Sequence, residues 1–218
     1  MKLILSWSGG KDSALSLYTL QQAGEHEIDA LLTTITRDYD RISMHGVRRS
    51  LLHQQAQAIG LPVLEVGISA NAANAEYEAN MAAVLSAYQQ QGIEAVAFGD
   101  IFLEDLRAYR EKNLQALDLT SVFPIWKRDT RELATTFLQL GFKAVVACVD
   151  TQVLDASFAG RLIDADFLRD LPAGIDPCGE NGEFHSFVFD GPIFSHPIPI
   201  TVGEKVMRDE RFCFSDFY

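Results

Sequence analysis

The sequence predicts an α/β fold with a doubly wound, mainly parallel sheet, followed by a smaller C-terminal α+β domain. First, short apolar runs alternate with stretches of helical spacing over residues 1–150, which is typical of βα units. Second, the opening apolar run ends at a glycine turn that leads straight into a helical pattern. Third, residues 151–218 instead contain Pro/Gly-rich turns and alternating apolar positions. We therefore expect two domains, residues 1–150 and 151–218.

Apolar spacing and glycines define the elements of the first domain in order. Residues 2–7 predict a strand and residues 12–24 a helix, and residues 28–35 predict the next strand. Val47 to Ile59 has helical spacing, which Gly60 ends. The remaining expected elements are strand 63–66, helix 73–91, strand 93–98, helix 106–117, strand 122–125, helix 129–140 with Asp129 as its N-cap, and strand 143–149, which closes the parallel series.

The second domain has fewer regular patterns. Residues 163–171 predict a short helix, and residues 187–189 predict a strand before the turn Asp190-Gly191-Pro192. Alternating apolar residues predict further strands near 198–202 and 212–214. The apolar tail, residues 212–218, is a candidate interface between copies of the chain, so a homo-oligomer is one expected state.

Composition restricts the class of protein. The net charge of −12 argues against a nucleic-acid partner and favours a small-molecule or protein substrate. No apolar run approaches the roughly 20 residues that span a bilayer, and no signal-peptide pattern opens the chain. The cysteine count of 3 without a C-x-x-C pair argues against a disulfide framework and a zinc knuckle. A cytoplasmic location without membrane contact is expected.

The segment Ser8-Gly9-Gly10-Lys11-Asp12-Ser13 predicts an anion site. It joins a buried strand to a helix N-terminus, where backbone N–H groups and a lysine can meet phosphate oxygens. The Walker form would need a glycine where Leu5 stands and Ser or Thr where Asp12 stands. The loop is therefore expected to bind phosphates in another way.

A second unusual segment, residues 176–185, carries two carboxylates and a histidine. Glu180 and Glu183 flank Gly182, and His185 follows. Residue types alone allow a Mg²⁺ site, an ammonium site or a general base. They equally allow a polar hairpin whose charges face water.

Together the two motifs resemble a known family. Ser8 to Ser13 is similar to the pyrophosphate loop of the N-type ATP pyrophosphatases, and adding Cys-Gly-Glu-Asn-Gly-Glu-Phe-His at 178–185 gives a resemblance to the diphthine–ammonia ligase family. The segments at 44–46, 98–101, 124–126, 159–161 and 190–192 also look like family segments. The resemblance implies an adenine-nucleotide α-hydrolase-like domain, ATP and Mg²⁺. It also implies an AMP-forming reaction in which a carboxylate is adenylated and ammonia then displaces AMP.

The resemblance also implies roles for individual residues. Lys11 and the loop amides would neutralise the triphosphate, while Asp12, and with it Asp100, would hold the metal. Glu180 and Glu183 would bind and deprotonate ammonium. The candidate substrate contacts are His45, Arg161 and His185. His45 could instead be an ordinary surface histidine. Arg161 could instead form an ion pair at the start of a helix.

The second motif differs from the eukaryotic and archaeal family pattern and looks like that of the bacterial branch. We then expect this chain to share the class of reaction with the family, but not the acceptor that the family name gives. Two other functions remain open. One is a thiolation enzyme acting on tRNA or a small molecule, for which Cys178 is the candidate sulfur carrier. The other is a regulator that binds ATP without turnover, which the intact Lys11, Asp12 and Glu183 argue against.

Overall fold

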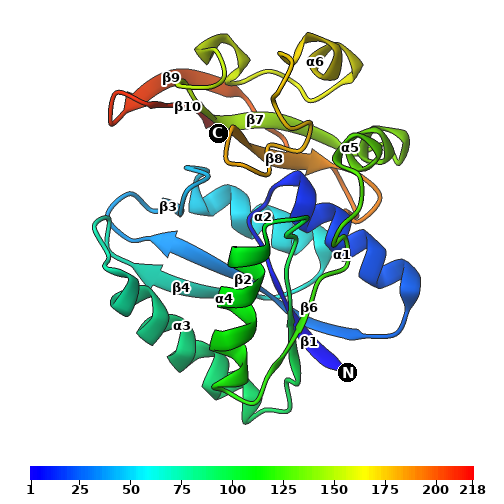
Figure 1. Cartoon of the computed structure of the whole chain (residues 1–218), viewed down its shortest axis with the longest axis vertical. Helices are drawn as coiled ribbons and strands as arrows, with labels where there is room; N and C mark the ends of the chain where they lie inside the picture. The colour runs from blue at the N-terminus through cyan, green and yellow to red at the C-terminus, as the bar shows by residue number, and fades with distance from the viewer.

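The computed structural model describes residues 1–218 as a mixed α/β protein with two sheets in separate layers (Figure 1). The first sheet has the order β3-β2-β1-β5-β6, and β4 also pairs with β2. All its pairings are parallel except that of β3. Its strands are β1 (Lys2–Ser6), β2 (Glu27–Thr36), β3 (Arg41–Ile42), β4 (Val63–Ile68), β5 (Ala95–Ala97) and β6 (Thr120–Val122).

The strand order of the first sheet reverses at β1. The chain passes from β1 to β2 and β4 on one side, and then crosses to β5 and β6 on the other. Ligands of open α/β sheets bind beyond the carboxyl ends of the strands at such a switch point. The residues that follow β1 and β5, namely Trp7–Ser13 and Phe98–Asp100, therefore lie at the expected ligand site.

Five helices connect these strands and lead to the second sheet, and they match the predicted helices to within a few residues. They are α1 (Lys11–Ala23), α2 (Arg49–Ile59), α3 (Asn74–Gln89), α4 (Glu104–Gln115) and α5 (Thr130–Gln139). The predicted N-cap of α5 is confirmed, since the Asp129 carboxylate accepts from the Glu132 amide at 2.8 Å. Gly60 ends α2 in the left-handed conformation, as predicted.

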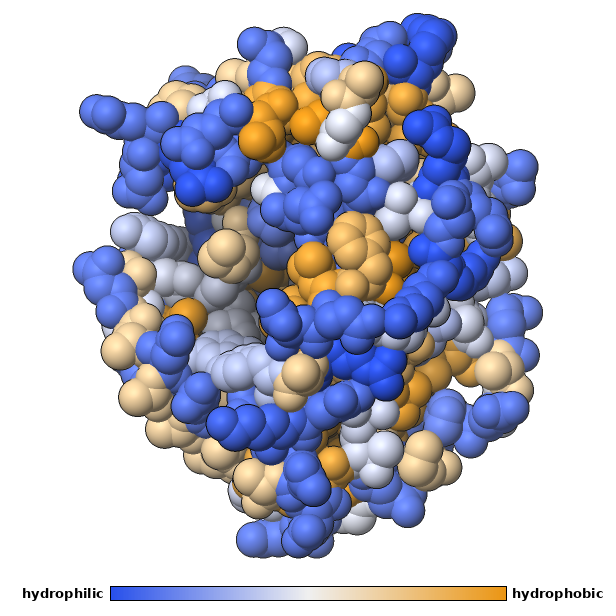
Figure 2. All heavy atoms as spheres, in the orientation of Figure 1, coloured by the Kyte–Doolittle hydropathy of each residue, from blue (hydrophilic) through white to orange (hydrophobic).

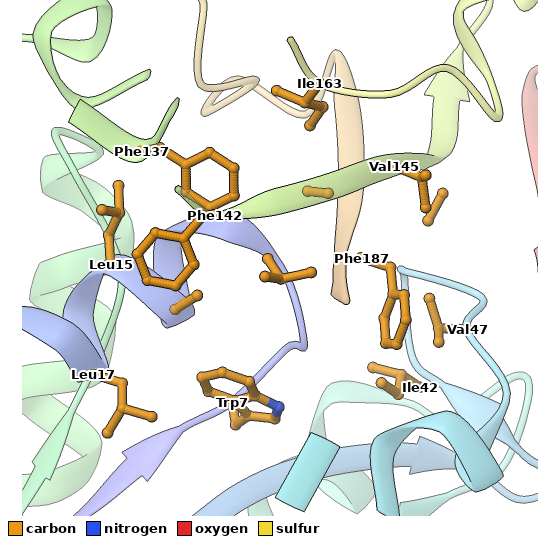
Figure 3. Close-up of a cluster of buried hydrophobic side chains, with 14 of the residues drawn as sticks. Trp7, Leu15, Leu17, Ile42, Val47, Phe137, Phe142, Val145, Ile163 and Phe187 are labelled. Carbon is orange, nitrogen blue, oxygen red and sulfur yellow. The ribbon is translucent and has the colours of Figure 1, made fainter. Parts of the chain in front are cut away.

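The two faces of the first sheet bury different partners. Ile4 belongs to a cluster of 11 buried residues beneath α3 and α4. Leu3 and Leu5 point the other way, into a cluster of 41 buried residues that includes α1, α2 and the second sheet. Figure 3 shows side chains from these layers meeting, among them Trp7, Leu15 and Phe187. The large cluster fixes the second sheet firmly against α1 and α2.

The second sheet is antiparallel, with the order β8-β7-β10-β9. It consists of β7 (Lys143–Asp150), β8 (Phe184–Asp190), β9 (Val202–Arg208) and β10 (Phe212–Phe217), accompanied by the short helices η1 (Ala156–Phe158) and α6 (Ala165–Asp170). The prediction that strand 143–149 closes the parallel series is wrong, because β7 pairs with β8 and β10. A continuous apolar run shows that a strand is buried on both faces, but not which sheet contains it.

Two smaller expectations also needed correction. The strand predicted at 122–125 lies at Thr120–Val122. The strand predicted near 198–202 begins only at its last residue, since β9 is Val202–Arg208. Ile198 is buried and donates its amide to the Phe189 carbonyl at 2.7 Å, which explains its apolar character without a strand. No helix of the chain is both long and apolar enough to cross a membrane.

Candidate functional site

A cleft of about 840 Å³ opens at the switch point of the first sheet. Its walls come from both sheets and from α3 and α4, and Figure 2 shows the surface hollowed below the second sheet. The predicted site residues that line it are Ser8, Gly10, Lys11, Asp12, Ser13, His45, Asp100, Glu180 and His185. The fold therefore brings most of the two sequence motifs to one cavity.

Residues Ser8–Ser13, the glycine loop, end in an uncapped helix N-terminus. Gly9 has φ +77°, a conformation that favours glycine, and Gly10 is the N-cap of α1 with no side-chain cap. The amides of Ser8, Gly9, Asp12 and Ser13 donate to no group of the chain. Unpaired N–H groups at a helix N-terminus bind anions, so the loop fits the phosphates of ATP.

Two residues that sequence reasoning missed hold this loop in place. The Gln55 side-chain amide donates to the carbonyls of Gly9 at 3.0 Å and Val188 at 2.7 Å. The Ser186 hydroxyl accepts from the Lys11 amide at 3.1 Å. The only signal for Gln55 is a polar residue on the apolar face of a helix, where it is fully buried. The loop is therefore fixed partly by β8 of the second sheet.

Lys11 is a buried cation in contact with a carboxylate. Its side chain is 3% exposed, and its ammonium lies 2.8 Å from the Asp12 carboxylate and donates to the Cys178 carbonyl. Burial lowers the pKa of Lys11, but the Asp12 carboxylate together with Cys178 and Glu180 outweighs burial, so the pKa lies above its ordinary value. Lys11 thus stays charged beside the free loop amides.

Asp12 fits a role in holding Mg²⁺. The ion commonly takes one or two carboxylates together with phosphate oxygens and waters. The Asp12 side chain is 27% exposed at the cleft and lies beside the loop amides. Asp100 also lines the cleft, but Arg110 binds its carboxylate at two positions, 2.5 and 3.1 Å. No group of three or more metal-ligating side chains is assembled, so the phosphates would have to complete the site.

Gly99 permits the close approach of the β5 end to α1, and its replacement should weaken ATP binding. A Cβ there would lie 3.0 Å from the Asp12 carbonyl carbon and 3.1 Å from the Ser13 nitrogen. Gly99→Ala would press the backbone of Asp12 and Ser13 away by a few tenths of an ångström, so we expect ATP to bind about tenfold more weakly in calorimetry. Gly92→Ala is the matched control, because its Cβ meets nothing within 4 Å and only its φ of +94° is strained. Unchanged ATP affinity in Gly99→Ala would contradict this account of the loop.

Glu180 extends a partly free carboxylate into the cleft. Its Oε1 accepts from the Ile101 amide at 2.7 Å, whereas its Oε2 has no partner in the chain. Burial raises the pKa of Glu180 to about 7. A carboxylate that titrates near neutral pH is suited to general base chemistry.

Glu183 lies outside the lining of the cleft. Its side chain is buried, and its two oxygens accept from the Asp176 amide and from both nitrogens of Asn181 at 3.0 to 3.1 Å. These bonds close residues 176–183 into a compact loop that presents Glu180. A catalytic role for Glu183 stays a prediction, and its contacts favour a positioning role.

The three candidate substrate contacts separate into two groups. His45 and His185 both line the cleft, with ring centroids 4.5 Å apart. Arg161 lies outside the lining, where it donates to the Asp170 carboxylate at 2.8 Å and stacks over Phe158. Its contacts agree with the ion-pair alternative.

Comparisons with known proteins cover nearly the whole chain. Residues 1–121 match the family model for the diphthamide synthase N-terminal domain, and residues 129–215 match that for the diphthamide synthase C-terminal domain. The chain is 27% identical to a diphthine–ammonia ligase from Danio rerio over 96% of its own length and 90% of the relative's. For the ligases from Mus musculus and Homo sapiens the identities are 25% and 24%, over 95% of this chain and 86% of each relative. The resemblance carried by the two motifs is confirmed, and the chain belongs to the diphthamide synthase family.

Proposed function

We propose that the chain is an ATP-dependent ligase that adenylates a carboxylate, releases pyrophosphate and transfers ammonia to the activated carbon. One observation carries this proposal: the free amides of the glycine loop, which follows β1 of the first sheet, and the Glu180 carboxylate, which precedes β8 of the second sheet, face the same cleft. A phosphate site and a base for an amine are thereby available to one reaction. The names of the relatives support the same reaction class.

The chemistry of amidation explains why both parts are needed. A carboxylate cannot expel oxide, whereas an acyl adenylate expels AMP. Charge that develops on the departing pyrophosphate would be stabilised by Lys11 and by the loop amides of α1. Mg²⁺ beside Asp12 would neutralise further phosphate charge when bound. Glu180 would then hold ammonium and accept its proton, so that ammonia can attack.

The acceptor is proposed more broadly than the names of the relatives suggest. It is a carboxylate of a small molecule or of a protein, and a diphthine-bearing protein is the first acceptor to test. The acidic balance of the chain favours such an acceptor over nucleic acid. A cytoplasmic location and assembly into a homo-oligomer stay predictions.

Labelled ammonia tests the proposal. The chain is incubated with ATP, Mg²⁺, ¹⁵N-ammonium and either the diphthine-bearing protein or a panel of carboxylate metabolites, and the products are examined by mass spectrometry. We expect ¹⁵N in a new amide only when ATP is present. ATP consumption that never places ¹⁵N in any product would count against ammonia transfer.

The thiolation alternative makes a distinct prediction at Cys178. A sulfur carrier reacts as a thiolate, but burial raises the pKa of Cys178 to about 12, and its Sγ contacts the Thr130 carbonyl at 3.3 Å. We therefore expect Cys178→Ala to form amide within about twofold of the wild-type rate. Loss of product formation in a normally folded Cys178→Ala variant would favour thiolation.

A further inference from the structure

The basic side chains that line the cleft are already paired, with one exception. Lys11 is neutralised by Asp12, and Arg110 by Asp100. The other basic residues in the lining are His45 and His185. A triphosphate therefore enters a cleft whose permanently charged basic side chains have carboxylate partners. Apart from Mg²⁺ and the loop amides, the histidine pair is the remaining group of the lining that can supply positive charge.

The two imidazoles are positioned beside the glycine loop from different elements. His45 follows β3, and its Nδ1 lies 3.3 Å from the Ser186 carbonyl. Its Cε1 would be 3.2 Å from a Cβ at Gly10, so the ring stands against the N-cap of α1. His185 belongs to β8, and its ring lies at a tilt of 37° to that of His45. Anion oxygens at the α1 N-terminus would thus be bound next to this pair.

We propose that the His45–His185 pair is a proton-dependent part of the phosphate site, which takes up one proton from solvent when the triphosphate binds. This inference rests on the proposed use of ATP. The added positive charge would stabilise the bound phosphates, because Lys11 already forms an ion pair with Asp12.

The charges around the pair agree with this inference. Burial lowers the pKa of His45 well below its ordinary value, and His185 and Lys11 lower it further against the hydrogen bond to the Ser186 carbonyl, which raises it. Burial, and then Lys11, lower the pKa of His185 to about 4. The carboxylates that line the same cleft are Asp12, Asp100 and Glu180, with Glu78 from α3. Both rings are consequently neutral at pH 7 in the free chain, and a nearby polyanion raises the pKa of an imidazole.

Calorimetry in buffers of different ionisation enthalpy measures the proton uptake directly. The probe is α,β-methylene ATP with excess Mg²⁺ at pH 7.5, which excludes turnover. In a Glu180→Gln background, which removes the other group of the cleft that titrates near pH 7, we expect the chain to take up as much as about one proton for each nucleotide bound. Adding His45→Asn and His185→Asn (the double variant) should abolish this uptake and weaken nucleotide binding about tenfold. His53→Asn is the control, because His53 is exposed and pairs with Glu65 outside the cleft.

The outcomes separate this inference from the proposed function. Nucleotide binding without proton uptake, or equal uptake by the double variant, overturns the inference and leaves the ligase reaction standing. A chain that binds no nucleotide contradicts both. If the double variant unfolds, the single variant His45→Asn, which changes only a loop residue, must lower the uptake, and an unchanged value rejects the proposal.

Discussion

Replacing Lys11 by alanine is expected to abolish formation of AMP from ATP. Lys11 is the one permanently charged basic side chain adjacent to the free amides of the glycine loop, and its pKa keeps it charged. Loss of a preorganised charge that stabilises a departing phosphate costs at least about 100-fold in rate. Product analysis by anion-exchange chromatography, with saturating ATP, gives the measurement.

Controls must separate lost chemistry from lost structure. Removing Lys11 leaves Asp12 without its partner and destabilises the fold by about 1–3 kcal/mol. Circular dichroism and thermal unfolding show whether the variant is folded at the assay temperature, and Lys11→Met preserves most of the volume. Lys143→Ala is the matched control, because Lys143 is exposed and pairs with Asp190 away from the cleft. A folded Lys11→Ala variant that makes AMP at the wild-type rate would contradict the assigned role.

Replacing Glu180 by glutamine should leave ATP binding intact and reduce amide formation by at least about 100-fold. With a pKa of about 7, Glu180 is largely protonated below pH 6, so the wild-type rate should rise through pH 7 as the carboxylate forms. Glutamine removes the base, and this pH dependence should disappear. Glu111→Gln, on the exposed face of α4, should retain the wild-type profile. A normal rate in Glu180→Gln would exclude Glu180 as the base.

The same substitution has a consequence for stability. The pKa of Glu180 is about 7 in the folded chain and 4.5 ordinarily, so the folded state holds the proton more tightly. Stability from this group is present below pH 4.5 and is lost as the pH rises through 7. Glu180→Gln should therefore be more stable than wild type at pH 8, by on the order of 1 kcal/mol after solvent screening, with little difference at pH 4. Equal stabilities at pH 8 would show that Glu180 is not desolvated as described.

Local patterns predicted the first sheet because each of its elements has its own signal. Gly60 and Asp129 stand where α2 ends and α5 begins, and apolar spacing marks the helices between. The strand predicted at 143–149 does not join the first sheet, because its partners, β8 and β10, come later in the chain. Pairing between distant segments leaves no periodic signal inside either segment.

The pairing of β7 supports a different domain boundary from the expected one at residue 151. Strand β7 belongs to the second sheet, and the two family models meet between residues 121 and 129. We propose that the second domain begins there rather than at residue 151. The segment carrying α5 and β7 would then be part of it.

The part of the candidate site that lies on a single turn, the glycine loop, could be predicted from the sequence. The glycine loop could be located from residues 8–13, because strand, glycine turn and helix start are adjacent in sequence. The sequence could not distinguish the roles of Glu180 and Glu183. Only the folded loop shows that Glu183 accepts hydrogen bonds from local amides, while Glu180 keeps one oxygen without a partner. Gln55 and Ser186 were missed for a similar reason, because they reach the glycine loop from distant elements.

The most direct test of the central claim is the fate of the ATP phosphates. The chain is incubated with ATP labelled at the α or γ phosphate, together with Mg²⁺, ammonium and an accepted carboxylate. We expect AMP that carries the α label and pyrophosphate that carries the γ label, in equal amounts with the amide. ADP and inorganic phosphate as the products would contradict it.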